Sequence, residues 1–589
     1  MTTDDHRPGP LPPAVADRLA RLAPDQRAAA TAPPGPVLCI APAGSGKTTT
    51  LVARVAWLVA TGIDPGTIAA ITFNARAAEE LRERLGPALE PMGVPAGAAG
   101  GVRVRTFHAL GLEILRDAGR SPKLIARDLV LRRVVPDADA AGRRRLDDAF
   151  SRLKLDLAVT AVVVARDPEP GPVARAFVAY ERALAAAGSV DFDDLVATAL
   201  RALEGDPVLL ARWRSRCAHL LVDEVQDVDR SQLRLALLLA APANRVFLVG
   251  DDDQSIYGWR LADVRRVLGL ATDLPGLRRV DLAVNYRCPA PVLARAVRLV
   301  EHNRERFAKT VRPGPSAAGR LILAPGPPGD DAPARVIAAL PADRGTRAVL
   351  ARTRRELLPL VAGCLAAGIP FRADGVVLPL EDPRVDDLLR RAETDSRPLP
   401  VAARLAMLAH DGDLRAAATP TGPGHVAAAQ SEPGQVADAP GEPGAASPDD
   451  PEPEPAWTRA QLVAALVGWA VRLAPGRDLA AEVTAARERL GALRRPDAGL
   501  VLATAHATKG LEWDHVAVLG MSEGRFPSAR SLAEAANPAR ALEEERRLAY
   551  VAWTRARRTL VLVYDPEAPS PFLREAFDLD ELAVGPAPS

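Results

Sequence analysis

The sequence predicts an α/β fold with largely parallel sheets, because three short apolar runs each lead into a glycine-rich or acidic turn. These runs are Val37–Ile40, His219–Val222 and Val246–Gly250. Parallel strands that are buried on both faces read as continuous apolar runs, and open α/β sheets bind their ligands beyond the carboxyl ends of such strands. At 589 residues the chain is long enough for about three or four domains.

The composition excludes several classes of protein. Lys and Arg number 75 against 74 Asp and Glu, a net charge of +1, so any nucleic-acid contact must be a local groove. The four cysteines are widely spaced without a CxxC pair, which argues against a zinc or iron–sulfur site and indicates a reducing compartment. No run approaches the roughly 18 apolar residues that span a bilayer. We therefore expect a soluble, cytoplasmic protein.

The first apolar run leads into a predicted phosphate-binding loop and a helix. The loop consists of Ala41, Pro42, Ala43, Gly44, Ser45, Gly46, Lys47 and Thr48. Small residues let backbone N–H groups close around a phosphate at the positive end of the following helix. Lys47 would reach the β- and γ-phosphates, and Thr48 would ligate Mg²⁺. The alternative is a glycine-rich turn with an incidental lysine.

Upstream of this loop, Gln26 is a candidate for base selection, because an amide can donate to and accept from an adenine edge at once. The alternative is that Pro24-Asp25 simply begins a helix.

Two further predicted strands, Ile68–Phe73 and Val102–Arg105, deliver aromatic and polar residues to strand ends. Phe73 follows the first, and Thr106-Phe107-His108 follows the second. These residues would lie where open α/β sheets bind ligands. The alternative is that Phe73 and Phe107 belong to the core.

The second decisive run ends in Asp223-Glu224. Asp223 would hold Mg²⁺, and Glu224 would orient or deprotonate the attacking water. A solvated turn is the alternative for an isolated Asp-Glu pair. Here the pair follows a buried strand, downstream of a phosphate loop, which favours the catalytic interpretation.

The third run leads to Gln254, which is placed to sense a γ-phosphate. Tyr257, Trp259 and Arg260 come just beyond it and suggest a stacking platform for unpaired bases. Each stacked base contributes about 1–3 kcal/mol. The segment would therefore tie the nucleotide state to base contact.

These motifs resemble those of the superfamily 1 DNA helicases of the UvrD/PcrA/Rep type. Later segments match further motifs of that family in the same order, namely Asn285–Arg287, Ala503–Trp513 and Glu543–Ala556. The chain departs from the family at Asn74-Ala75, which replaces Thr-Asn, at Thr49, where arginine is frequent, and at Leu261, where glycine is usual.

The resemblance implies two RecA-like domains with ATP between them. The second domain would supply Arg287 and Arg555 as arginine fingers, while Tyr286 would stack on adenine opposite Gln26. Glu512 would contact the ribose or support Lys47. Single-stranded DNA would contact Phe73, Thr106, His108, Tyr257, Trp259, Arg260 and His506. The alternative for His108 and His506 is a structural role.

The same resemblance predicts the order of the domains along the chain. We expect a disordered leader (1–20), a first RecA-like domain (21–114 and 189–280) with a helical insertion (115–188), a second RecA-like domain (281–390 and 499–575) with a reduced accessory region (391–498), and a tail (576–589). The Pro-, Gly- and Ala-rich stretch 416–456 is expected to be disordered.

The function implied is an ATP- and Mg²⁺-dependent 3′→5′ DNA helicase or translocase in repair or recombination, acting on single-stranded DNA and on duplexes with a 3′ tail. One alternative is a translocase that displaces proteins without unwinding. Another is a non-motor, ATP-switched DNA-binding subunit, although a switch has no need of a full hydrolytic set. No residue visibly reads or rejects a 2′-hydroxyl, so RNA stays open.

Overall fold

The computed structural model describes residues 11–94, 101–155, 171–258, 261–315, 318–326, 332–341, 343, 345–409, 457–474 and 477–583. The chain divides into two compact units. Unit 1 comprises Met1–Asp374 and Arg495–Ser589, and unit 2 comprises Gly375–Arg494. No helix in the described ranges is both long and apolar enough to cross a membrane.

The first sheet of unit 1 has six parallel strands in the order β3-β2-β6-β7-β1-β8. Their bounds are β1 (Val37–Ile40), β2 (Ile68–Thr72), β3 (Arg103–Thr106), β6 (His219–Val222), β7 (Val246–Gly250) and β8 (Arg278–Asp281). The three apolar runs are therefore strands β1, β6 and β7, which are neighbours in the middle of this sheet.

Helices cover both faces of this sheet because successive strand residues point to opposite sides. Val37 and Cys39 pack in a core with α3 (Lys47–Ala60) and α4 (Ala75–Leu89). Leu38 and Ile40 pack in a second core. Its helices are α5 (Phe107–Asp117), α10 (Asp194–Gly205), α11 (Pro207–Arg216), α12 (Arg230–Ala240), α13 (Val264–Leu268) and α14 (Leu270–Asp273). Phe107 belongs to that core and is buried.

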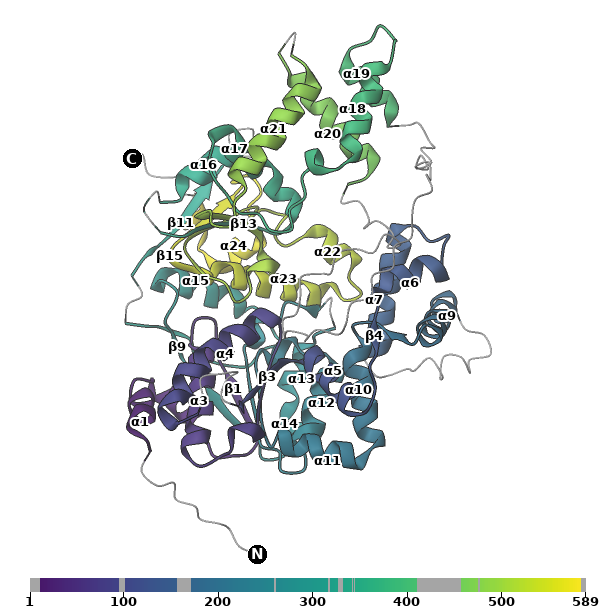
Figure 1. Cartoon of the computed structure of the whole chain (residues 1–589). Helices are drawn as coiled ribbons and strands as arrows, with labels where there is room; N and C mark the ends of the chain where they lie inside the picture. The colour runs from purple at the N-terminus through teal and green to yellow at the C-terminus, as the bar shows by residue number, and fades with distance from the viewer. Residues whose placement is uncertain are drawn as a thin grey trace, which may run out of the picture. The chain divides into compact units, whose positions relative to one another are not determined.

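The second sheet has five parallel strands in the order β11-β15-β14-β12-β13, of which β11, β13 and β15 are labelled in Figure 1. Their bounds are β11 (Arg320–Pro325), β12 (Arg347–Ala351), β13 (Leu500–Thr504), β14 (Trp513–Val518) and β15 (Ala556–Tyr564). One face packs against α15 (Ala290–Val300), α23 (Pro538–Trp553) and α24 (Pro571–Ala576). The remaining helices are α16 (Ala332–Ala339), α17 (Leu358–Ala367), α22 (Ala529–Glu534) and α25 (Leu579–Ala583). The prediction of two α/β domains with parallel sheets is confirmed.

A two-stranded parallel ladder, β9 (Val284–Asn285) with β10 (Arg312–Pro313), lies in the segment that runs between the two sheets. Between these two strands the chain forms α15 and then a stretch without regular structure, residues 301–311.

The insertion in the first domain contains α6 (Arg127–Val134), α7 (Ala140–Leu155) and α9 (Pro172–Ala186), which share a small apolar core. The strands β4 (Lys123–Leu124) and β5 (Ser189–Val190) pair at its base. Just beyond β5, the buried Asp191 contacts Lys154 of α7 at 2.9 Å and Arg127 of α6 at 2.8 Å, and it accepts a hydrogen bond from the Tyr180 hydroxyl at 2.7 Å. The base of the insertion is therefore held by a buried polar network.

Unit 2 has its own apolar core, formed by α18 (Arg384–Thr394), α19 (Val401–Leu408), α20 (Arg459–Arg472) and α21 (Leu479–Leu493), which are labelled in Figure 1. Val385, Leu388 and Ala392 of α18 face this core. Residues 410–456, which include the predicted disordered loop, lie outside the described residues.

Three boundaries differ from those that we expected. Residues 13–20, placed in a disordered leader, form α1 (Pro13–Ala20), because Val15 and Leu19 are buried in an apolar cluster with Leu22 and Ala53. Unit 2 begins at Gly375 rather than 391, because α18 packs into its core.

The third boundary is that of the tail. Phe577 packs into the core of the second sheet, and Arg295 of α15 pairs with Glu581 at 2.6 Å. The fold of the second domain therefore continues beyond residue 576.

Candidate nucleotide-binding site

The loop between β1 and α3 has the backbone geometry of a phosphate cradle. Gly44 and Gly46 have φ angles of +69° and +84°, a region that favours glycine. A Cβ on Gly46 would lie 2.6 Å from Nε2 of Gln26, and a Cβ on Gly44 would lie 2.7 Å from Cβ of Arg287. The first N–H groups of α3 have no partner within the helix, so they form an anion site.

A cavity of about 620 Å³ contains this loop and receives residues from both sheets of unit 1. The first domain supplies Lys47, Thr48, Asp223, Glu224 and Gln254, and the second supplies Arg287, Lys509, Glu512 and Arg555. All five residues of the first domain follow one of the three neighbouring strands β1, β6 and β7. The carboxyl ends of parallel strands meet at one edge of the sheet, which explains why residues more than 200 positions apart converge here.

Lys47 and Glu224 form an ion pair, with Nζ and Oε1 2.7 Å apart. Glu224 has a φ of +52°, a conformation that is uncommon for a residue with a side chain and that recurs at functional sites. Although burial opposes ionisation, Lys47 and Lys509 hold the pKa of Glu224 well below its usual range. Burial and the neighbouring Glu224 raise the pKa of Asp223 to about 7. The two adjacent carboxyls therefore differ in their tendency to ionise.

Gln254 connects the two domains. Its Nε2 donates to Oδ2 of Asp251 at 2.8 Å, and its Oε1 accepts from Arg555 of the second domain at 3.4 Å. The Arg555 residue is 1% exposed, and it has no ion-pair partner among the described residues. Burial and the nearby Arg287 lower the pKa of the Arg555 guanidinium to about 9. A buried cation without a carboxylate, on the wall of a cavity, creates a position for an anion.

Lys509 is a site residue to which the sequence analysis assigned no role. Its Nζ donates to the carbonyl of Gln254 at 2.8 Å, contacts Asp227, and lies 3.5 Å from Oε2 of Glu224. Burial lowers the pKa of Lys509, but Asp227 and Glu224 raise it above its ordinary value. The sequence signal for Lys509 is its position in the segment Ala503–Trp513, which also contains His506 and Glu512.

The residues expected to hold the base and ribose are arranged as follows. Tyr286 is 50% exposed and lines the cavity, as a stacking surface must. Nε2 of Gln26 donates to the Ser45 carbonyl at 2.8 Å, so its amide supports the phosphate loop, and α2 (Pro24–Ala30) begins at Pro24. Glu512 pairs with Arg287 and Arg557, whereas Lys47 pairs with Glu224.

The residues that line this cavity fit a nucleoside triphosphate with Mg²⁺. The Ser45 Oγ atom is buried without a hydrogen-bond partner among the described residues, and the cradle at Gly44 and Gly46 would be filled by any Cβ. Among the described residues, no group of three or more His, Cys, Asp and Glu is arranged to hold a metal alone. Magnesium in nucleotide sites commonly uses one or two carboxylates together with phosphate oxygens. Thr48 and Asp223 suit that mode of binding.

Two of the residues predicted to contact DNA line the same cavity. The rings of Phe73 and Tyr257 are stacked with centroids 5.0 Å apart, and both belong to the wall near the phosphate loop. The Lys509 Nζ lies 5.4 Å from the centroid of the Tyr257 ring. The stacked pair of Phe73 and Tyr257 therefore lines the same cavity as the phosphate loop.

Thr106 and His108 lie at the start of α5. Oγ1 of Thr106 accepts from the Ala109 N–H at 3.2 Å and so caps the helix. His108 stacks on Phe192 with centroids 3.9 Å apart.

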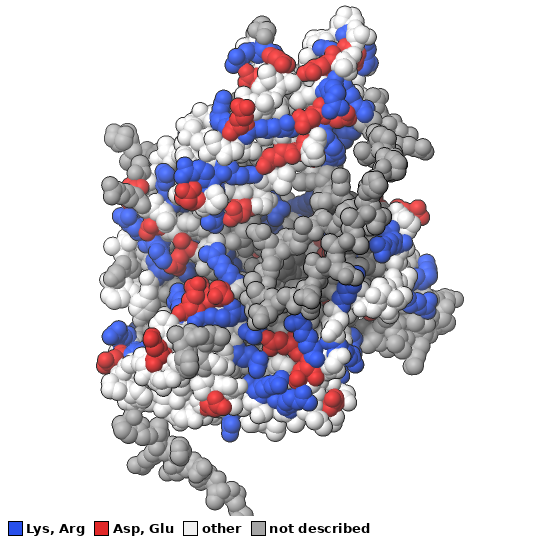
Figure 2. Space-filling view, in the orientation of Figure 1, with Lys and Arg blue, Asp and Glu red and all other residues white. Residues whose placement is uncertain are grey.

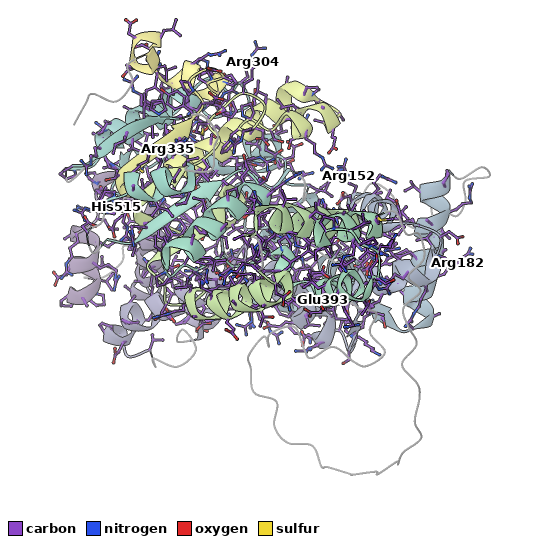
Figure 3. The ribbon with its side chains drawn as sticks, turned by 90° about the horizontal axis from the view of Figure 1, so that it is seen from above. Arg152, Arg182, Arg304, Arg335, Glu393 and His515 are labelled. Atoms are coloured by element: carbon purple, nitrogen blue, oxygen red, sulfur yellow. The ribbon has the colours of Figure 1, made fainter. Side chains whose placement is uncertain are left out.

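A second cavity of unit 1, of about 790 Å³, contains His506 together with Gly258, Glu544 and Arg152. Burial and the nearby Arg352 lower the pKa of His506 to about 4, so its ring is neutral at physiological pH. Arg152 comes from α7 and is labelled in Figure 3. On the face shown in Figure 2, basic and acidic side chains are interspersed, in agreement with the balanced composition. Trp259 and Arg260 lie outside the described residues.

The fold and the site define the class as a P-loop NTPase fold with two RecA-like domains. Residues 22–275 match the profile of the UvrD/REP helicase N-terminal domain, and residues 491–567 match that of the UvrD-like helicase C-terminal domain. Together the two profiles match more than half of the chain, which belongs to the UvrD/Rep helicase family.

Curated relatives from several bacteria agree with this assignment. The chain is 32% identical to ATP-dependent DNA helicase UvrD1 of Mycobacterium tuberculosis over 66% of this chain and 54% of that protein. It is 28% identical to DNA helicase II of Escherichia coli K12 over 92% of this chain and 84% of that protein. The identity to ATP-dependent DNA helicase Rep of the same strain is also 28%, over 92% and 90%. The chain thus spans about half of the length of the mycobacterial relative.

Proposed function

We propose that this protein is an ATP-dependent DNA helicase or translocase that moves 3′→5′ along single-stranded DNA and separates duplexes with a 3′ tail. The single observation that carries the proposal is the buried guanidinium of Arg555, which has no carboxylate partner in the part of the chain that the structure describes. It lies on the wall of a cavity that also holds a phosphate-binding loop from the other domain. The names of the relatives supply the substrate class, which the cavity alone does not determine.

The proposal assigns a role to each side chain of the site. Lys47 and the N–H groups of the loop would bind the β- and γ-phosphates, and Gln254 would contact the terminal phosphate. Glu224, held ionised by two lysines, would orient and deprotonate the attacking water. Bound Mg²⁺, ligated by Thr48 and Asp223, would neutralise charge on the phosphates. Tyr286 would stack on the base, Gln26 would select it, and Glu512 would lie near the ribose.

Arg287 and Arg555 would act as arginine fingers on the transferring phosphoryl group. Such a finger contributes about 10³–10⁵ in rate, or about 4–7 kcal/mol. Because the fingers and the phosphate loop come from different domains, hydrolysis would require the domains to be closed, and each turnover would permit them to open.

Repeated closing and opening would move a DNA strand held by Phe73, Thr106, His108, Tyr257, Trp259, Arg260 and His506. Repair or recombination is the proposed cellular setting.

The first experiment is strand separation of short duplexes that carry either a 3′ or a 5′ single-stranded tail, with ATP and Mg²⁺. The proposal predicts unwinding of the 3′-tailed duplex alone and none by Lys47→Ala, which loses ATP turnover. DNA-stimulated ATP hydrolysis without unwinding of either duplex would indicate the translocase alternative. Normal ATP turnover by Lys47→Ala would refute the assignment of the nucleotide site.

A further inference from the structure

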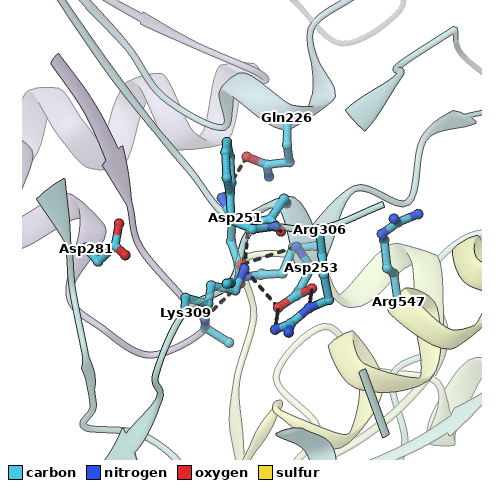
Figure 4. A network of polar contacts seen from close by, with 12 residues as sticks. Gln226, Asp251, Asp253, Asp281, Arg306, Lys309 and Arg547 are labelled. Atoms are coloured by element: carbon cyan, nitrogen blue, oxygen red, sulfur yellow. Dashed lines mark hydrogen bonds and ion pairs between the residues drawn. The ribbon is translucent and has the colours of Figure 1, made fainter. Parts of the chain in front are cut away.

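A cluster of three consecutive buried carboxylates precedes Gln254 in the sequence, and two of them, Asp251 and Asp253, are labelled with Lys309 in Figure 4. Asp251, Asp252 and Asp253 follow β7, and their side chains are at most 1% exposed. The Nζ of Lys309 lies 2.7, 2.6 and 2.8 Å from oxygens of these three residues in turn. Its own side chain is 1% exposed. Lys309 comes from the stretch between α15 and β10, far from the cluster in sequence.

Asp251 connects this lysine to the candidate site. Its Oδ1 accepts from Lys309, while its Oδ2 accepts from Nε2 of Gln254 at 2.8 Å and from the Ala43 N–H of the phosphate loop at 3.1 Å. Its own N–H donates to Oε1 of Gln226 at 3.0 Å, and the Gln226 amide donates to Glu224. One carboxylate therefore orients the sensor glutamine, the loop and, through Gln226, the proposed general base.

The stretch that carries Lys309 also forms hydrogen bonds with α23 of the second domain. The Arg304 N–H donates to Glu543 of α23 at 3.0 Å, and Asn303 accepts from Nη1 of Arg546 at 2.6 Å. The end of α23 leads directly to Arg555, which donates to Gln254. Residues 303–309 therefore contact both Asp251, which binds Gln254, and α23, which leads to Arg555.

We infer that Lys309 is a positioning residue for ATP hydrolysis: it fixes Asp251, and through Asp251 it fixes Gln254 in register with the phosphate loop and Arg555. This inference rests on the proposed function. A misplacement of about 1 Å at a reacting group can cost about 100-fold in rate. Loss of Lys309 is therefore expected to lower kcat while the nucleotide still binds.

The chain offers a matched control. Arg306 belongs to the same stretch and pairs with the same cluster, but it contacts Asp253 alone, with Nη2 2.8 Å from Oδ2. Lys309→Met and Arg306→Met each remove one cation from the cluster, and only the first removes the partner of Asp251. Arg306→Met leaves Asp253 paired with Lys309, whereas Lys309→Met also leaves Asp252 without a cation, so the melting temperature of each variant is measured beside its kcat.

The experiment measures kcat and KM for ATP with saturating single-stranded DNA, and the melting temperature, for the full chain. Lys309→Met should lose about 100-fold in kcat with KM within about threefold, whereas Arg306→Met should keep kcat within about threefold and lose less melting temperature, because Asp253 keeps Lys309. Equal losses of kcat in the two variants, or wild-type kcat in Lys309→Met, would overturn the inference.

A second variant covers the case in which Lys309→Met does not fold. Lys309→Met with Asp252→Asn removes one charge of each sign, so it restores the charge balance while Asp251 still lacks its lysine. The inference predicts a recovered melting temperature and a kcat that stays low, and a restored kcat would overturn it. An inactive wild-type protein would instead refute the proposed function, because that baseline is measured separately.

Discussion

Two buried arginines on or just beyond α23 should respond in opposite ways to substitution. Arg555 has no ion-pair partner among the described residues, and it donates to the carbonyls of Val551 at 2.8 Å and Leu511 at 3.2 Å. Arg546 is also buried, but its guanidinium lies 2.8 Å from Glu575. We consider Arg555→Met and Arg546→Met, which remove the charge and keep most of the apolar volume.

The magnitudes follow from these contacts. Removing one partner of a buried ion pair costs about 3–5 kcal/mol. Arg546→Met should fall near the lower end, about 3 kcal/mol, because the Glu575 side chain keeps 21% exposure. Arg555→Met loses four hydrogen bonds of about 1 kcal/mol each, including those to Gln254 and Thr554, but it also removes a buried charge whose desolvation costs several kcal/mol. Its stability without nucleotide should therefore stay close to that of the wild type.

Activity should show the reverse order. Arg555→Met should lose about 10³–10⁵ in kcat for ATP, the range expected for an arginine finger. Arg546→Met, assayed at a temperature where it is folded, should keep kcat within about tenfold, because Arg546 supports the helix without lining the cavity. The assays are DNA-stimulated ATP hydrolysis and thermal melting without nucleotide.

The electrostatic reasoning would be refuted by a drop in melting temperature for Arg555→Met as large as that for Arg546→Met. It would also be refuted by a kcat within tenfold of the wild type in a folded Arg555→Met protein.

Three further predictions concern stability. Leu261 has a φ of +66°, so Leu261→Gly should raise the free energy of unfolding by up to about 1 kcal/mol, whereas Asn244→Gly (φ +49°) should change it little, because asparagine tolerates this conformation. Urea denaturation measures both, and a loss on Leu261→Gly would contradict the strain argument. Asp191→Asn should cost about 3 kcal/mol, the lower end of the range for a buried ion pair, because Lys154 keeps Asp194 and Arg127 keeps Asp193. The control Asp147→Asn, at a side chain that is 52% exposed, should cost less than about 1 kcal/mol, and similar losses in the two would argue against the buried network. Burial, with Arg245 and Arg54, lowers the pKa of His219 to about 4. Above pH 6.5 the shift does not affect the free energy of unfolding, because His219 is neutral in both states. Between pH 6.5 and about 4 the unfolded state binds a proton that the folded state does not, so the free energy of unfolding falls by about 1.4 kcal/mol for each pH unit of decrease. His219→Gln should flatten that part of the pH–stability curve, and an unchanged slope would exclude His219 as its source.

The parts of the site that could be predicted from the sequence are those that each lie within one short segment. The phosphate loop, Asp223-Glu224 and Gln254 each follow an apolar run of four or five residues, and these runs form β1, β6 and β7. Because the runs are parallel strands of one sheet, their carboxyl ends meet at one edge without further information. The cavity that contains Lys47, Glu224 and Gln254 agrees with this expectation.

Pairings between distant segments could not be predicted in this way. Lys509 reaches Asp227 across 282 positions, and Glu512 pairs with Arg287 rather than with Lys47. Lys309 lies in a stretch without regular structure, where no periodicity marks it as buried. A lysine in such a stretch is normally solvated, so only the fold reveals the three carboxylates around it.

The boundary of unit 2 could not be predicted either, because it also depends on packing between distant segments. In α18 the apolar residues Val385, Leu388, Leu389 and Ala392 recur at helical spacing, so the helix itself could be predicted. The spacing does not reveal whether that apolar face packs against the second sheet or against α19 and α20. The structure shows the latter, because Leu405, Leu462 and Leu466 complete the same core. An amphipathic pattern determines that a face is buried, and the residues that cover it are determined by the fold as a whole.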